Sequence, residues 1–66
     1  AGSGDVLTGI ITALLARGYH QQNACMVGMY LHGLAGDLAA KELGKESLVA
    51  GDIINYLPKA FKLLDD

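Results

Sequence analysis

Apolar residues near the start of the chain repeat with the spacing of an α-helix. They recur as i, i+1, i+4 and i+5, at Val6, Leu7, Ile10, Ile11, Leu14 and Leu15, and no charged residue interrupts them. This spacing lines one face of a helix, which we predict from about Asp5 to Arg17. Gly18 follows at the position where a left-handed residue commonly ends a helix.

A second, longer helical pattern starts near Gln21 and ends at Gly44, another candidate for a helix stop. Glycines interrupt its interior, and each costs about 1 kcal/mol relative to alanine. Close approach of a neighbouring helix would offset that cost. We therefore expect Gly33 and Gly36, together with nearby alanines, to pack tightly against another helix.

The segment LVAGDIINYL predicts a short third helix, which is followed by Pro58. A proline either breaks a helix or occupies the first turn of a new one. We therefore expect a break at Pro58 or a fourth helix that begins there. No segment alternates like a strand, so residues 1–66 predict an all-α unit of three to four helices.

Composition and charge exclude several classes of protein. The chain is 52% hydrophobic and 18% charged, which argues against disorder, and its net charge is −2. The few basic residues are scattered, so nucleic-acid binding is not expected. The uncharged stretch 18–36 carries too many polar side chains for a membrane span. Cys25 is the single cysteine, which excludes an internal disulfide and favours the cytoplasm.

The stretch GSGD at residues 2–5 is the main candidate for chemistry. Glycines let backbone N–H groups converge on an anion, and a helix N-terminus favours negative charge. Asp5 beside a bound phosphate fits a general base that takes a proton from an attacking hydroxyl. The alternative is structural: Ser3 caps the helix and Asp5 interacts favourably with the helix dipole. Spacing alone leaves both interpretations open.

Other polar or sulfur-containing residues predict structure rather than chemistry. His32 and Asp37 fall on different faces of the second helix, so an interhelical hydrogen bond or a buried histidine is expected there, and no metal site. Cys25, Met26 and Met29 are expected to fill the core.

Three blocks in order resemble a known family: GSGDVLTGIITALLARG, MYLHGLAGDLAAKELG and LVAGDIINYLPKA. They are similar to the C-terminal end of the ADP-dependent NAD(P)H-hydrate dehydratases, which belong to the ribokinase-like superfamily. The resemblance covers nearly the whole chain. It implies that residues 1–66 are a C-terminal helical segment of an α/β ribokinase-like domain, with the central sheet upstream.

The resemblance also implies an activity and its residues. Such enzymes are lyases that repair hydrated NADH or NADPH at the expense of ADP or ATP, with Mg²⁺. Gly2, Ser3 and Gly4 would bind nucleotide phosphate. Asp5 would contact the hydrated substrate and act as the catalytic base that activates its hydroxyl. Ala1 stands where the family usually has glycine, and Thr8 where it often has alanine.

Two other interpretations remain open at this point. The chain could come from another ribokinase-like enzyme that phosphorylates a small heterocyclic alcohol, although YLHGLAGD favours the dehydratase. It could also be a helical interaction module without chemistry. As an isolated fragment it is expected to be inactive and to form a homo-oligomer, because the first helix has more apolar surface than its neighbours can cover.

Overall fold

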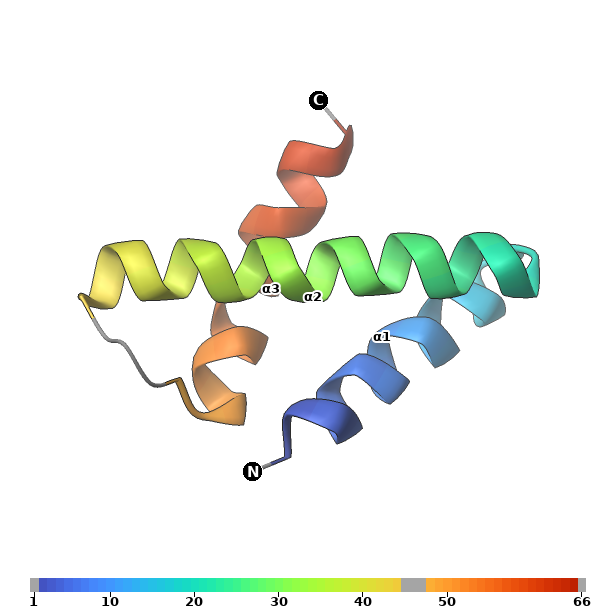
Figure 1. Cartoon of the computed structure of the whole chain (residues 1–66). Helices are drawn as coiled ribbons and strands as arrows, with labels where there is room; N and C mark the ends of the chain where they lie inside the picture. Colours follow the sequence, from blue (N-terminus) through green and yellow to red (C-terminus); the bar gives the residue numbers. More distant parts are fainter. Residues whose placement is uncertain (1, 45–47, 66) are drawn as a thin grey trace.

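The chain folds into three helices around one small core. The computed structural model describes residues 2–44 and 48–65, which form α1 (Ser3–Ala16), α2 (Gln21–Leu43) and α3 (Ala50–Asp65). In Figure 1 the long α2 is central, α1 lies along one end of it, and α3 crosses behind it. The described residues contain no strand, which confirms the all-α prediction for the chain.

Helix α1 ends as its sequence predicts. Gly18 adopts a left-handed conformation with φ 98°. Its N–H donates to the carbonyl of Leu15 at 3.0 Å, and the N–H of Tyr19 donates to the carbonyl of Leu14 at 3.1 Å. This pair of bonds is the Schellman motif, which satisfies carbonyls that the last helical turn leaves free. The backbone itself therefore turns the chain from α1 into α2.

Helix α2 also ends at its predicted glycine, but its close contact is not at the predicted position. Gly44 has φ 66°, and its N–H donates to Ala40. A side chain at Gly28 would lie 2.7 Å from Cγ1 of Ile11, whereas one at Gly33 would meet nothing within 4 Å and one at Gly36 only Leu48 at 3.9 Å. The prediction for Gly33 is wrong because that residue lies on the exposed face of α2.

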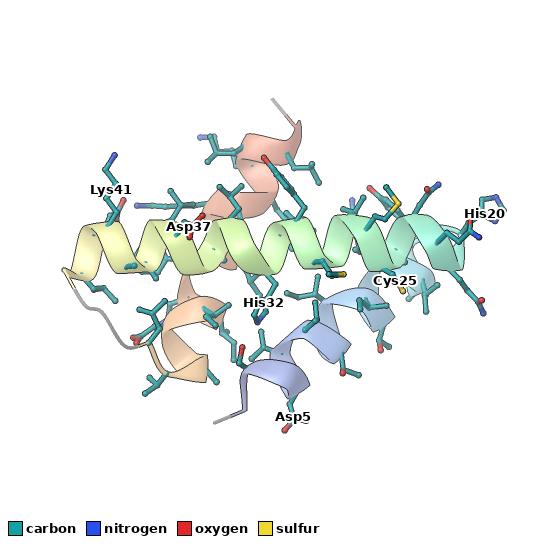
Figure 2. All side chains as sticks on the ribbon, viewed as in Figure 1. Asp5, His20, Cys25, His32, Asp37 and Lys41 are labelled. Carbon is teal, nitrogen blue, oxygen red and sulfur yellow. The ribbon has the colours of Figure 1, made fainter. Side chains whose placement is uncertain are left out.

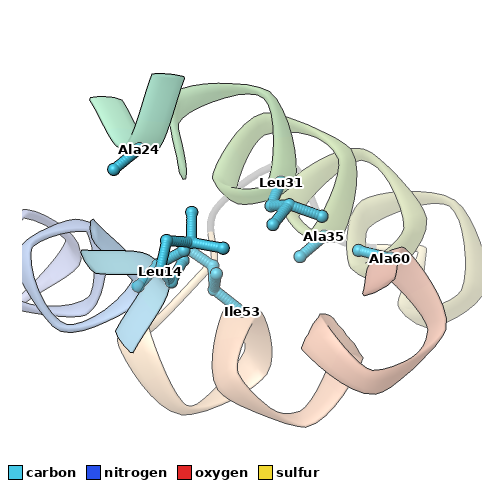
Figure 3. Packing of buried hydrophobic residues seen from close by; sticks show 7 residues of the cluster. Leu14, Ala24, Leu31, Ala35, Ile53 and Ala60 are labelled. Atoms are coloured by element: carbon cyan, nitrogen blue, oxygen red, sulfur yellow. The ribbon is translucent and has the colours of Figure 1, made fainter. Parts of the chain in front are cut away.

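The core is built from small and branched apolar residues of all three helices (Figure 3). Its buried members are Ile10, Leu14, Ala24, Leu31, Ala35, Ala39, Ile53 and Ala60. Alanines on α2 let the other helices approach closely, since they add little bulk.

The sulfur-containing residues of α2 lie outside this core. Cys25 is exposed, and the side chains of Met26 and Met29 are 68% and 63% exposed. The core-filling prediction is therefore wrong: these residues lie on the face of α2 that turns away from α1 and α3.

Among the described helices, none combines the length and apolar character that crossing a membrane requires.

Helix α3 continues through Pro58, so both a break and a fourth helix were wrong predictions. A proline in a helix interior has no N–H for the carbonyl four residues earlier, here that of Ile54. Ile53 and Ala60, on either side of Pro58, are 6% and 0% exposed in the common core. Their burial stabilises both halves of α3 despite the lost hydrogen bond.

Candidate functional site

The glycine-rich turn forms the start of α1. Gly2 is the N-cap residue, in a left-handed conformation with φ 88° and ψ −4°. Ser3, Gly4 and Asp5 form the first helical turn, two residues earlier than predicted, and the first α-helical bond runs from the N–H of Val6 to the carbonyl of Gly2. The N–H groups of a first turn have no partner within their helix. All four predicted site residues are thus brought together at one helix end.

The two glycines of this turn have different surroundings. A side chain at Gly2 would lie 3.3 Å from Cβ of Ala50 at the start of α3, in addition to the strain of its positive φ. A side chain at Gly4 would meet nothing within 4 Å. Gly2 therefore allows the chain to turn beside α3, and Gly4 leaves the first turn open to an approaching group.

Ser3 does not cap the helix, contrary to the structural interpretation of its sequence. Gly2 occupies the N-cap position, and the Ser3 side chain is directed at α2 instead. Its Oγ lies 2.9 Å from Nε2 of His32, and the same nitrogen lies 3.2 Å from the carbonyl oxygen of Ser3. Figure 2 shows His32 extending from α2 toward α1. The expected interhelical hydrogen bond of His32 is confirmed, with a partner in the glycine turn.

Asp5 is exposed at the same end of α1 (Figure 2). Its carboxylate is the one charged group among the residues that line a groove of about 430 Å³ between α1 and α3. The remaining lining residues are small or apolar: Val6, Gly9, Ile10, Ala13, Ile54, Leu57 and Phe61. Asp5 is therefore accessible to a ligand at the glycine turn, next to an apolar surface.

The sequence did not show that His32 is connected to the candidate site. Its isolation among small and apolar residues of α2 indicated a hydrogen bond, but the partner lies 29 positions away in the chain. Asp37 is exposed and is not joined to this cluster. Within residues 2–44 and 48–65, no three His, Cys, Asp or Glu side chains gather as a metal site would require.

Comparison with known proteins identifies the family. Residues 1–59 match the profile of the NAD(P)H-hydrate dehydratases. The chain belongs to this family. The match confirms the resemblance seen in the three sequence blocks, and it favours the dehydratase over the kinase and over the module without chemistry.

Curated relatives agree along almost the whole chain. A bifunctional NAD(P)H-hydrate repair enzyme Nnr of Thermofilum pendens is 50% identical over 64 residues, which are 97% of this chain and 12% of the relative. The Nnr enzyme of Moorella thermoacetica is 47% identical over all 66 residues, again 12% of its length. An ADP-dependent (S)-NAD(P)H-hydrate dehydratase of Natrialba magadii is 39% identical over 62 residues, 94% of this chain and 24% of that protein.

The chain thus spans about an eighth of the Nnr relatives and about a quarter of the shorter dehydratase. No solved structure matches it.

Proposed function

We propose that this chain is the C-terminal helical segment of a ribokinase-like domain that dehydrates hydrated NADH or NADPH with ADP or ATP. In this proposal Gly2, Ser3 and Gly4 bind the phosphates of the nucleotide, and Asp5 is the catalytic base. The observation that carries it is the start of α1. A left-handed glycine, an open first turn and an exposed carboxylate meet there in a member of the dehydratase family.

Phosphate binding follows from the backbone of this turn. The free N–H groups at the start of α1 carry the positive end of the helix dipole, which favours a phosphate oxygen. Because Gly4 has open space around it, a phosphate can approach the main chain closely. The turn also lies beside the start of α3, where a Cβ at Gly2 would be 3.3 Å from Cβ of Ala50.

Asp5 then activates the hydroxyl of the hydrated nicotinamide. Its carboxylate takes the hydroxyl proton while the oxygen forms a bond to the terminal phosphorus, and the bond from that phosphorus to the rest of the nucleotide breaks. ADP would leave AMP, and ATP would leave ADP. The new phosphate ester then loses phosphate together with a proton from the neighbouring ring carbon, which restores the double bond.

Mg²⁺ fits this arrangement as a companion of the nucleotide. It binds oxygen ligands and is usually held by phosphates with one or two carboxylates. Asp5 is the one carboxylate at the turn, so this segment would contribute at most one ligand and the phosphates the rest. The ion would supply neutralisation of the phosphate charge.

The test is Asp5→Asn in a full-length enzyme that contains this segment. Losing a positioned base typically lowers the rate by about 10² to 10⁴. We expect kcat for hydrated NADH to fall by that factor, while calorimetric ADP affinity stays nearly unchanged because the backbone turn is intact. Asp37→Asn is the matched control, since Asp37 is also exposed but lies on α2 outside the site. A kcat within threefold of the parent enzyme for Asp5→Asn would contradict the assignment.

The proposal extends to the surroundings of the segment. In the full-length protein, which we place in the cytoplasm, the rest of the domain would cover the apolar groove between α1 and α3. An isolated chain would leave that groove open, be inactive and self-associate, because exposed apolar surface of this kind drives association. Light scattering at tens of micromolar should give at least a dimer mass, and a clean monomer mass would contradict self-association.

A further inference from the structure

His32 of α2 contacts Ser3 of the glycine turn at two oxygens. One ring nitrogen, Nε2 of His32, is within hydrogen-bonding distance of two oxygens of the same residue, the hydroxyl at 2.9 Å and the carbonyl at 3.2 Å. A carbonyl oxygen only accepts hydrogen bonds. The tautomer that serves both contacts therefore has its hydrogen on Nε2, which donates to both oxygens as a bifurcated bond.

This arrangement orients the Ser3 hydroxyl. Because Nε2 is a donor, it cannot accept from Ser3, and the hydroxyl hydrogen is directed away from His32. Ser3 belongs to the first turn of α1, where the free N–H groups lie. The hydroxyl is thereby available as an additional donor at the end of the helix where the proposed phosphate binds.

We infer that His32 is a positioning residue for the nucleotide: it holds Ser3 so that the hydroxyl donates to a phosphate oxygen. The inference rests on the proposed function and adds to it a residue of α2 and a side-chain donor. His32 acts through Ser3 and does not itself touch the reacting atoms.

Two features support a role of His32 beyond packing. Ser3 is the first residue of α1, so its helix offers it no carbonyl four residues earlier, unlike Thr8, whose hydroxyl donates to the carbonyl of Gly4 at 3.0 Å. The contact that orients Ser3 comes from another helix instead. The helices are also close one turn from His32, where a Cβ at Gly28 would lie 2.7 Å from Cγ1 of Ile11. Close packing there limits how far Ser3 can move relative to α2.

The test compares His32→Gln with His32→Leu in the full-length enzyme. The amide NH₂ of Gln can donate from about the place of Nε2, whereas Leu keeps bulk and removes the donor. We expect His32→Leu to raise KM and Kd for ADP about tenfold, the size of one hydrogen bond to a charged group. His32→Gln should stay within about threefold of the parent enzyme. For both variants, kcat at saturating ADP should change by less than about threefold.

Ser3→Ala tests whether His32 acts through Ser3. If it does, the double variant Ser3→Ala, His32→Leu binds ADP about as weakly as the weaker single variant. Fully additive losses, or equal losses for His32→Gln and His32→Leu, would overturn the inference. So would a lower melting temperature for His32→Leu with unchanged ADP affinity.

Gly4→Val separates failure of this inference from failure of the proposed function. A side chain at Gly4 has space in the fold but would obstruct a phosphate at the turn. Weaker ADP binding by Gly4→Val with no effect of the His32 variants would overturn the role of His32 and retain the phosphate site. Unchanged ADP affinity in Gly4→Val and Ser3→Ala would overturn both.

Discussion

Helix α1 has two neighbours, and it packs against them differently. Against α2 it is so close that Gly28 has no room for a methyl group, since a Cβ there would lie 2.7 Å from Ile11. Against α3 it leaves a groove of about 430 Å³ lined by apolar side chains. Gly9 lines this groove, and a Cβ at that position would meet nothing within 4 Å.

The difference shows which contacts the segment completes by itself. Interiors of folded proteins are close-packed, with few voids larger than a water molecule. The α1–α2 seam meets this standard, whereas the groove leaves Ile54 52% exposed and Leu57 and Phe61 half-buried. The close contact between α1 and α2 positions the glycine turn through His32. The groove between α1 and α3 is the surface that the rest of the proposed full-length domain would cover.

The largest effect is expected from Gly28→Ala, which adds a methyl group to the close contact between α1 and α2. The added methyl group would overlap Ile11, and overpacking typically costs about 1–3 kcal/mol, which exceeds the gain of about 1 kcal/mol in helix propensity. Urea unfolding followed by circular dichroism should show a lower free energy of unfolding. A stability equal to or above that of the parent chain would mean that the seam can widen at little cost.

Gly9→Ala should instead raise the free energy of unfolding of the isolated chain, at concentrations low enough to keep it monomeric and the groove uncovered. The new methyl group would point into open space, so the gain in helix propensity of up to about 1 kcal/mol is unopposed. Gly33→Ala is the matched control, since Gly33 is an exposed helix-interior glycine away from both seams. Both variants should be stabilised in the same unfolding experiment. Destabilisation by Gly9→Ala alone under these conditions would show that the groove is filled in the monomer.

A smaller effect is expected at the surface between α2 and α3, where Lys59 donates to both carboxylate oxygens of Glu42 at 2.8 and 3.0 Å. The hydrogen bond from Lys59 lowers the pKa of Glu42 below its ordinary value of 4.5. The resulting stabilisation is present above that ordinary value and is lost as the pH falls through the lowered pKa.

Glu42→Gln should therefore change the melting temperature slightly at neutral pH and not at all at a pH below the lowered pKa of Glu42. Both side chains are exposed, so high salt should reduce the difference at neutral pH. A large change that persists in high salt would contradict this interpretation, because salt screens the contribution of an exposed ion pair.

Local chemistry makes the C-terminal ends of α1 and α2 predictable from the sequence, although not the start of α1. Gly18 and Gly44 were identified as stops, and both have a positive φ. Pro58 was misjudged because its local preference is outweighed by burial of Ile53 and Ala60 on either side. Helix propensity is a weak guide where tertiary packing decides.

The faces of α2 were harder to predict. Apolar or small residues occur all around this helix, so Met26 and Met29 could not be distinguished from the buried Leu31 by spacing. The tight contact at Gly28, rather than at Gly33, depends on where Ile11 of another helix lies.

The candidate site also has one part that the sequence predicts and one part that only the fold reveals. Gly2, Ser3, Gly4 and Asp5 are contiguous, so the sequence alone indicated them as a unit. The contact between Ser3 and His32 spans 29 positions and exists only because α1 and α2 pack side by side. The partner of His32 could therefore be identified only from the fold.

The Schellman motif at the end of α1 has a consequence for how this segment can vary in evolution. The turn from α1 to α2 is made by main-chain bonds from Gly18 and Tyr19, while the side chains of Arg17, Tyr19 and His20 are exposed. Mutations at those three positions should be nearly neutral for the fold. Gly18 is different, since a left-handed backbone with φ 98° costs other residues about 1–2 kcal/mol. Natural variants should therefore change the chemistry of this surface freely while they keep one invariant glycine within it.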